Sequence, residues 1–347
     1  FRNIASLELA LCPGANVIYG DNGQGKTNFI EAVWMCTGAK SFRGAKDAEL
    51  IRENAGYAVA EGETQGFGKE SRIRVFVGGQ PGARKARTVH VNGVDYGRAA
   101  NAAGTFTAVV FDPGHLSLVK GSPEGRRRFL DAALCQLYPG YVTLLRRYSG
   151  LVTQKNALLK SYWQTPDANG LLDVFDEKLA ESGAAVSAKR QEYLALIEPE
   201  ITGTYRDIAS GSETLAIQYE PSFEPEKGLA PVLRESRARD IAAGFCTAGP
   251  HREDFSISID GRAAKVFASQ GQQRSAVLSL KLAEAAGAQK ITGEHPVMLL
   301  DDVISELDET RQSYLLSRME HRQTIVTACD PDLFRRTSGR VYRMEGG

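Results

Sequence analysis

A glycine-rich stretch near the start of the chain constrains the fold more than any other feature. It matches GxxxxGK[ST] at every fixed position, between residues 15–19, typical of a buried strand, and residues 27–37, which have helical apolar spacing. This context argues against an ordinary glycine-rich turn and predicts a P-loop (Walker A) whose backbone N–H groups cradle phosphates. The predicted nucleotide-binding residues are Gly20, Asp21, Asn22, Gly23, Gln24, Gly25, Lys26, Thr27 and Asn28.

The P-loop chemistry assigns individual roles to two of these residues. Lys26 is expected to reach the β- and γ-phosphates and to act in catalysis, and the Thr27 hydroxyl is expected to ligate Mg²⁺. The predicted cofactors are therefore ATP and Mg²⁺.

A second motif completes a nucleotide site. The apolar residues 297–300 are followed by Asp301 and Asp302, as in a Walker B strand. Asp301 would hold Mg²⁺, directly or through water, and Asp302 stands where a general base would polarise the attacking water. Because most of the chain separates the two motifs, we predict that an insertion splits the nucleotide-binding fold.

The residues between the two motifs change pattern twice. A period-two pattern predicts an antiparallel sheet, and an Asn-Gly pair at 92–93 is typical of a hairpin. Heptad spacing then predicts two helices, through 144–162 and 172–196, that form a short antiparallel hairpin and end near Pro199. The strands expected in the sheet are 57–61, 72–77, 87–91 and 106–111.

Residues 200–245 are harder to interpret, although a helix near 229–243 is plausible. Strands and helices are again predicted from residue 253 onward. The expected strands are 255–259, 296–300 and 324–328, and the expected helices are 270–289 and 308–321.

A Ser-x-Gly-Gln-Gln pattern marks the start of the predicted helix 270–289 and contains Ser269, Gly271 and Gln272. Alone, Ser269 is better explained as a helix N-cap. The position shortly before the Walker B strand favours an ABC signature motif, in which the serine, the glycine and the helix N-terminus face an anion. Residues 305–308 resemble a D-loop, and Asp308 is equally suited to cap the next helix.

The formal net charge of the 347 residues is zero, so a nucleic-acid surface must come from local clusters. Basic residues outnumber acidic ones eight to two over 115–160 and seven to two over 69–98. Such patches suit phosphate backbones, although intramolecular ion pairing is the better explanation for any single arginine, and 126–128 could brace the core. The predicted DNA-binding residues are Arg72, Arg74, Arg84 and Lys85.

Other features narrow the class of protein. The five cysteines form no CxxC pair, which favours reduced thiols in a cytosolic protein over a zinc or disulfide framework. No apolar run approaches membrane-spanning length, so we expect no membrane partner. The chain begins at Phe1 without a methionine, and we expect preceding residues, with an edge strand, to be missing. From its chemistry alone, His251 is assigned no role.

Several segments together resemble the RecF family of bacterial recombination mediators, nearly end to end. Residues 249–252 and 126–131 are far more specific than the generic nucleotide motifs. The segments that carry the resemblance are 20–28, 38–43, 118–123, 126–131, 249–252, 269–273 and 299–302.

The resemblance implies an ABC head similar to those of SMC proteins, without their long coiled coil. It implies ATP-dependent homodimers, double-stranded and gapped DNA binding, slow DNA-dependent ATP hydrolysis, and cooperation with RecO and RecR in loading RecA. Roles in replication, repair and the SOS response to DNA damage, and a cytoplasmic, nucleoid-associated location, follow from it. On the resemblance alone, Arg43 is expected near the nucleotide.

Two departures from ABC proteins predict slow hydrolysis. Asp302 replaces the usual glutamate and is one methylene shorter, and residues 327–329 offer no histidine after the last core strand. No Q-loop glutamine is evident, and Asp112 is a candidate for its place. Slow hydrolysis suits a protein in which bound ATP acts as a timer or a clamp better than it suits a motor protein.

The predicted fold class is α/β, a P-loop ABC-type ATPase head with an antiparallel sub-sheet, interrupted by a mostly helical domain that contains the hairpin. Residues 1–120 and 246–347 would form the ATPase domain and 121–245 the arm. In the predicted dimer, Ser269 and Gly271 act on the partner's nucleotide. The alternatives are another SMC-like ATPase coupled to a nuclease in repair or defence, a transporter ATPase subunit, and a DNA-binding scaffold with a vestigial site.

Overall fold

The computed structural model describes residues 1–66, 68–78, 86–319, 322–330 and 339–346. Within them, five strands form a parallel sheet in the order β12-β1-β11-β10-β6. The P-loop follows the strand second from one edge, and the Walker B acids follow the strand two places further along. The strands are β1 (Ala15–Tyr19), β6 (Ala108–Phe111), β10 (Val297–Asp301), β11 (Thr324–Ala328) and β12 (Gly339–Arg343).

Helices cover both faces of this sheet, because alternate strand residues point to opposite sides. On one face, Ile18 and Leu299 pack in a cluster with Ile30 and Trp34 of α1 (Lys26–Met35). The other face contributes to the largest core cluster of the described residues, together with α3 (Pro123–Leu137) and α8 (Gln270–Thr292). The β1–α1 unit agrees with the predicted strand–loop–helix.

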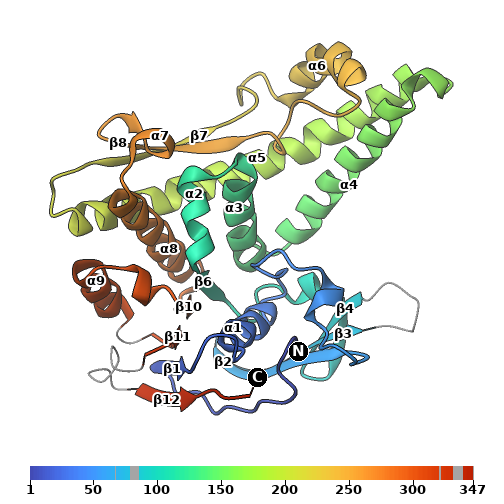
Figure 1. Cartoon of the computed structure of the whole chain (residues 1–347). Helices are drawn as coiled ribbons and strands as arrows, with labels where there is room; N and C mark the ends of the chain where they lie inside the picture. Colours follow the sequence, from blue (N-terminus) through green and yellow to red (C-terminus); the bar gives the residue numbers. More distant parts are fainter. Residues whose placement is uncertain (67, 79–85, 320–321, 331–338, 347) are drawn as a thin grey trace.

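A separate four-stranded antiparallel sheet, ordered β2-β3-β4-β5, lies beside the parallel sheet (Figure 1). Three of its predicted strands are confirmed, and the Asn-Gly pair at 92–93 turns the β4–β5 hairpin. The assignment of 106–111 to this sheet was wrong, because β6 pairs with β10 in the parallel sheet. All four residues of β6 are buried, as expected for a strand of a parallel sheet that is packed on both faces. The strands are β2 (Ala58–Gly66), β3 (Lys69–Gly78), β4 (Ala86–Val91) and β5 (Val94–Arg98).

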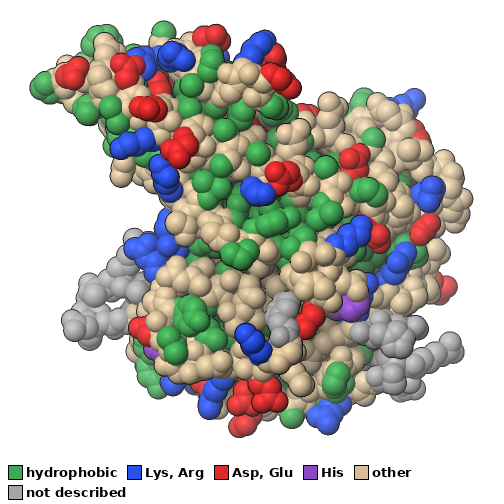
Figure 2. Space-filling view, turned by 180° about the vertical axis from the view of Figure 1, so that it is seen from behind, with side chains coloured by type: hydrophobic (Ala, Val, Ile, Leu, Met, Phe, Trp, Pro, Cys, Tyr) green, Lys and Arg blue, Asp and Glu red, His purple; other side chains and the backbone are tan. Residues whose placement is uncertain are grey.

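The predicted helical hairpin is present and forms an arm that projects from the head (Figures 1 and 2). It consists of α4 (Tyr141–Lys160) and α5 (Ala168–Ile208), and the predicted helix near 229–243 is α6 (Leu229–Ala243). The expected end near Pro199 was wrong, because α5 continues through it. Beyond Pro199, Ile201 and Tyr205 are fully buried, and this packing offsets the backbone hydrogen bond that proline removes.

Three further strands link the arm to the head. The sequence did not predict β7, and its pairing with β8 crosses the expected domain boundary at residue 245. The α8 helix packs along α5, so the arm and the signature helix share one core. The elements are β7 (Leu215–Glu220), β8 (Asp254–Ile259), β9 (Arg262–Ala263) and α7 (Ala264–Phe267).

The remaining elements are short, apart from the predicted helix that follows the D-loop. None of the helices that the structure describes is both long and apolar enough to span a bilayer. They are α2 (Ser117–Lys120), α9 (Glu309–Met319), η1 (Asp47–Leu50), η2 (Ala99–Ala102), η3 (Pro113–Leu116), η4 (Tyr162–Gln164) and η5 (Ile304–Glu306).

Candidate nucleotide-binding site

The P-loop backbone depends on its glycines. Gly25, the N-cap of α1, has φ +98°, and Gly23 has φ +84°, which are left-handed values that side chains disfavour. At Gly20 a Cβ atom would lie 2.4 Å from the carbonyl oxygen of Met344, next to the sheet. No acid lies in the first turn of α1, so its N-terminus is suited to an anion.

Lys26 is mostly buried against its own loop. Its Nζ donates hydrogen bonds to the carbonyl oxygens of Gly20 (2.6 Å) and Asp21 (2.9 Å). The ammonium group is therefore held at the centre of the loop, where it can meet a phosphate without leaving the site.

Asp301 is the point where the two nucleotide motifs meet. The hydroxyls of Thr27 and Thr327 donate to its Oδ1, at 2.9 and 2.7 Å. Burial raises the pKa of Asp301, the two hydroxyl hydrogen bonds oppose this, and the neighbouring carboxylates of Asp112 and Asp302 raise it further. A buried carboxylate beside two others favours a cation, and hydroxyl and carboxylate oxygens are donors that Mg²⁺ prefers. Thr27 and Asp301 therefore fit a magnesium site.

Asp302 has an unusual backbone, with φ +52°. Its N–H donates to Thr327 Oγ1 (3.0 Å), and the Ser305 hydroxyl donates to its carbonyl oxygen (3.0 Å). Aspartate tolerates this left-handed conformation better than most residues. The bend separates the Asp302 side chain from that of Asp301, so two consecutive acids can take different roles.

Asp112 follows β6 and shares the carboxyl edge of the sheet with Asp301. Burial would raise the pKa of Asp112, but the hydrogen bond and charge of His115 and the N–H of Gly114 lower it. The structure thus brings the predicted Q-loop substitute to the edge that carries Walker B.

Sequence reasoning missed two residues at the mouth of the P-loop. Asn3 donates to the carbonyl oxygen of Gly23 (3.0 Å) and accepts from Asn28. The Cys329 thiol contacts Asn22 (3.3 Å) and lies 3.9 Å from Lys26 Nζ. The position of Cys329 directly after β11 could have indicated it, since ligands bind at the carboxyl ends of parallel strands. Nothing local marks Asn3.

Arg43 reaches the same region, as the resemblance implied. Its Nη1 donates to Asn28 Oδ1 (2.9 Å) and lies 3.9 Å from the buried carboxylate of Glu31.

Gln24 of the P-loop forms a contact with the C-terminal segment. Its side-chain oxygen accepts a hydrogen bond from the N–H of Gly346 (2.6 Å).

The signature residues do not join the P-loop of their own chain. Ser269 caps α8 in a capping box, accepting from Gln272 N (3.2 Å), so the helix-cap interpretation is correct as geometry. The Gln272 side chain also donates to Glu213 (2.8 Å). Figure 1 shows the start of α8 beside α7, well away from β1 and α1. Ser269 is nevertheless exposed and available to another molecule.

The D-loop is tied to the signature helix. Glu306 pairs with Arg274 of α8 (3.1 Å), and Arg311 donates to Ser275 (2.8 Å) while its N–H bonds Asp308 (3.0 Å). Asp308 therefore caps α9, as expected.

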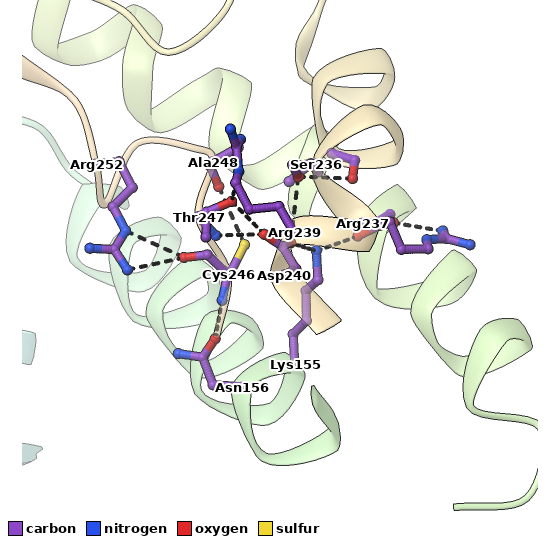
Figure 3. A network of polar contacts seen from close by, with 12 residues as sticks. Lys155, Asn156, Ser236, Arg237, Arg239, Asp240, Cys246, Thr247, Ala248 and Arg252 are labelled. Carbon is purple, nitrogen blue, oxygen red and sulfur yellow. Dashed lines mark hydrogen bonds and ion pairs between the residues drawn. The ribbon is translucent and has the colours of Figure 1, made fainter. Parts of the chain in front are cut away.

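Several cations of the two basic clusters are used inside the molecule. Arg126 forms a bidentate pair with Asp254 (both 2.7 Å), and Arg127 donates to the carbonyl oxygen of Glu253, so these residues brace the core. Lys155 is fully buried in the arm, between Asp176 (2.8 Å) and Asp240 (2.9 Å), in a polar network (Figure 3).

The predicted DNA-binding residues divide into two pairs. Arg72 and Arg74 are exposed on β3, and both pair with Glu61. Arg84 and Lys85 lie outside the described residues.

His251 is a structural residue in this arrangement. Its ring nitrogens hydrogen-bond the Tyr148 hydroxyl (2.6 Å) and the carbonyl oxygen of Cys246 (3.0 Å). Burial lowers the pKa of His251, which favours the neutral ring. Gly249 (φ +119°) leaves room for the same hydroxyl, which a Cβ atom would meet at 2.6 Å. This explains why residues 249–252 form a dense polar turn.

Comparisons with known proteins show which family the chain belongs to. The model of the RecF/RecN/SMC N-terminal domain family matches residues 1–345. The DNA replication and repair protein RecF of Halalkalibacterium halodurans is 38% identical over 96% of this chain and 91% of its own, and that of Agathobacter rectalis is 39% identical with the same coverage.

Solved structures give the same result. The recombination mediator protein RecF with ATPrS, in the RecFOR pathway, matches with a TM-score of 0.90 and 33% identity, covering 100% of this chain and 94% of the other. An Smc head domain of Pyrococcus furiosus, with a TM-score of 0.50 and 16% identity over 97% of this chain and 89% of the other, shares the fold. The ABC-type head, the antiparallel sub-sheet and the helical insertion predicted from the sequence are confirmed. The chain belongs to the RecF/RecN/SMC N-terminal domain family and, within it, to the RecF proteins.

Proposed function

We propose that this chain is an ATP-dependent DNA-binding protein of replication and recombinational repair. The observation that carries the proposal is the convergence of Thr27 and Thr327 on buried Asp301, beside the P-loop and Asp302. The RecF relatives, with solved structures that contain ATP or ATPrS, support ATP as the nucleotide.

The residues at the carboxyl edge of the sheet would have different roles in ATP hydrolysis. Lys26 and the N–H groups of the P-loop would bind the β- and γ-phosphates, and Thr27 and Asp301 would hold Mg²⁺, which neutralises phosphate charge when bound. Asp302 would orient the attacking water. Its short side chain, and a thiol at Cys329 in place of an imidazole, support slow hydrolysis. A dependence of hydrolysis on DNA is proposed from the likeness to RecF proteins.

The signature residues support a shared nucleotide site. Ser269 is exposed and is not hydrogen-bonded to its own P-loop in the described part of the chain. In the proposed ATP-dependent homodimer, Ser269, Gly271 and Gln272 of one subunit would close over the nucleotide of the other across a two-fold axis. We further assign residues 1–120 and 246–347 to the ATPase domain and 121–245 to the arm.

The relatives also suggest partners. RecF of the RecFOR pathway is the structural match, so we propose RecO and RecR as partners, with double-stranded or gapped DNA as the substrate surface. Assistance in loading RecA, and a cytoplasmic, nucleoid-associated site of action, follow from the same likeness.

Complementation between two inactive variants tests the shared site. Lys26→Ala removes the P-loop cation, and Ser269→Arg places a bulky cation against the partner's nucleotide while leaving monomer ATP binding intact. Each variant alone should lack ATPase activity. A mixture can form one intact site per heterodimer and should regain measurable activity.

If the mixture stays inactive, cross-linking shows whether the nucleotide site is shared between subunits. A cysteine at position 269 should cross-link to the partner's P-loop in the ATP-bound dimer, even if hydrolysis needs both sites at once. Absence of this cross-link in a dimer that binds ATP would contradict the shared site.

A further inference from the structure

The two helices of the arm carry very different charge. The α4 helix has four cations and no acid in its twenty residues, whereas α5 has eight acids and four cations. Exposed helix faces usually mix both signs, which keeps them soluble without attracting one kind of ligand. The net charge of α4 is therefore positive and that of α5 negative, and only α4 lacks acids altogether. The acids of α5 are Asp173, Asp176, Glu177, Glu181, Glu192, Glu198, Glu200 and Asp207.

Two of the four α4 cations are used within the arm. Lys155 is buried between two carboxylates, and Arg147 pairs with Glu181 of α5 (3.1 Å). Arg146 and Lys160 are exposed, and no acid in the described ranges forms an ion pair with either of them. Arg146 and Lys160 are therefore the two cations of α4 that can contact another molecule.

Arg146 and Lys160 lie on the same face of α4. They are about four turns apart, or about 21 Å along the axis, so their side chains point in similar directions. That face is opposite to the one that buries Tyr148 and Leu158.

The side chains between the two cations are small. Gly150, Thr153 and Ala157 lie between them on the outward face, with nothing within 4 Å of the position of a Cβ atom at Gly150. Small side chains allow a phosphate backbone to approach a helix closely while longer cations on either side reach it. Figure 2 shows Lys and Arg side chains along the hollow between the arm and the head.

We propose that the outward face of α4, defined by Arg146, Gly150, Thr153, Ala157 and Lys160, contacts the phosphate backbone of duplex DNA. This assignment rests on the proposed DNA-binding function and names a surface for it. The chemistry favours a polyanion, because no acid in the described part of the chain forms an ion pair with either of the two cations on this face. It is not expected to discriminate sequence, since it offers no side chain suited to base edges except at its ends.

The test is the salt dependence of duplex binding by Arg146→Gln/Lys160→Gln. Each lost phosphate contact should reduce the slope of log affinity against log salt by about 0.9, so the slope of the double variant should be shallower by about 2 units. Its affinity at moderate salt should fall by about tenfold. Binding is measured by fluorescence anisotropy with random-sequence duplexes in a series of KCl concentrations.

Arg206→Gln/Lys290→Gln is the matched control. Both residues are exposed cations in the last turns of long helices, α5 and α8, so their loss should affect helix stability at least as much. This control should retain the parent's slope and affinity. All variants should bind ATP like the parent, which also shows that they are folded.

The outcomes separate the assignment from the function on which it rests. A parent that binds duplex DNA, together with a double variant of unchanged slope and affinity, would overturn the α4 assignment alone. A folded, ATP-binding parent that does not bind duplex DNA would overturn the proposed function and this assignment with it. An equal loss in the control variant would also overturn the assignment, because it would show a general charge effect.

Discussion

In the arm, the ammonium group of Lys155 is fully buried and donates hydrogen bonds to Asp176 and Asp240. At the carboxyl edge of the parallel sheet, Asp301 is almost as buried, but it accepts hydrogen bonds from two hydroxyl groups and has no cation as an ion-pair partner among the described residues. Asp240 is satisfied further by the N–H (2.8 Å) and hydroxyl (2.6 Å) of Thr247 (Figure 3). The charges of this buried network are therefore compensated within the chain.

The pKa directions express the same difference. Burial would lower the pKa of Lys155, but its two carboxylate partners raise it, so the charged form is stabilised. Burial and two neighbouring carboxylates raise the pKa of Asp301, so its charged form is destabilised. The buried ion pairs of Lys155 stabilise the packing of the arm helices. Asp301 is a buried carboxylate without a cationic partner, which is typical of a site where a bound cation provides the opposite charge.

The largest effect is expected from breaking the compensated site. Lys155→Met would leave the buried carboxylate of Asp240 without its cation and that of Asp176 with only its ion pair to Arg237, and the free energy of unfolding should fall by about 3–5 kcal/mol. Urea denaturation at neutral pH measures it.

Lys178→Met is the control for this substitution. Lys178 is exposed on α5 and should change the free energy of unfolding by less than about 0.5 kcal/mol. An equally small effect of Lys155→Met would show that the buried network contributes little to stability.

A smaller stability effect and a clear functional effect are expected at the P-loop. Lys26→Ala removes a charge-assisted contact with phosphate, so ATP affinity should fall by at least about tenfold in a folded protein. Titration with a fluorescent ATP analogue measures the affinity, and Lys290→Ala serves as a control distant from the loop. Unchanged ATP affinity in folded Lys26→Ala would exclude the Walker A assignment.

Removing the uncompensated charge should not destabilise the unliganded protein. The folded-state pKa of Asp301 lies above that of the unfolded chain, so its ionisation at neutral pH opposes folding, and stability should rise as the pH falls through the folded value. Asp301→Asn can still accept both hydroxyl hydrogen bonds. The free energy of unfolding should stay constant or rise by up to about 1 kcal/mol.

Two measurements complete this prediction. Addition of MgATP should raise the Tm of the parent and not that of Asp301→Asn, because the variant lacks the carboxylate for Mg²⁺. Asp254→Asn, the same change in a residue paired with Arg126, should instead lower stability. A loss of stability in unliganded Asp301→Asn as large as that of Asp254→Asn would contradict the contrast between the two regions.

The sequence predicted the features that short-range patterns encode. The P-loop, the Walker B strand and the helical hairpin all have local periodicity or fixed spacing, and their elements were found as expected. The pairing of β6 was not predictable in this way, because four apolar residues fit either sheet and only long-range contacts decide between them. The continuation of α5 past Pro199 likewise depends on tertiary packing.

The candidate site shows the same limit. The residues within motifs were identified directly, whereas Asn3 and Cys329 reach the P-loop only through the fold. Lys155 lies in the heptad segment 144–162, and it was also counted among the basic residues of 115–160 that could form a positive surface. Its two carboxylate partners lie on α5 and α6, distant in sequence, so no local pattern could pair them.

The smallest effect is expected on the antiparallel sheet, where compensation is partial. Arg72 and Arg74 share the single carboxylate of Glu61, and all three side chains are at least partly exposed, so the ion pairs should contribute less than about 1 kcal/mol to stability. If this strand contacts DNA, Glu61→Gln frees one cation and should strengthen duplex binding a few-fold, with the salt slope steeper by about 1 unit. Arg72→Gln/Arg74→Gln should have the opposite effect, and the triple variant should match that double variant, because the carboxylate then has no cation to release. Duplex binding by all three variants over a series of salt concentrations measures these effects. If Glu61→Gln leaves affinity and slope unchanged while the α4 double variant reduces both, DNA contact lies on the arm and not on this sheet.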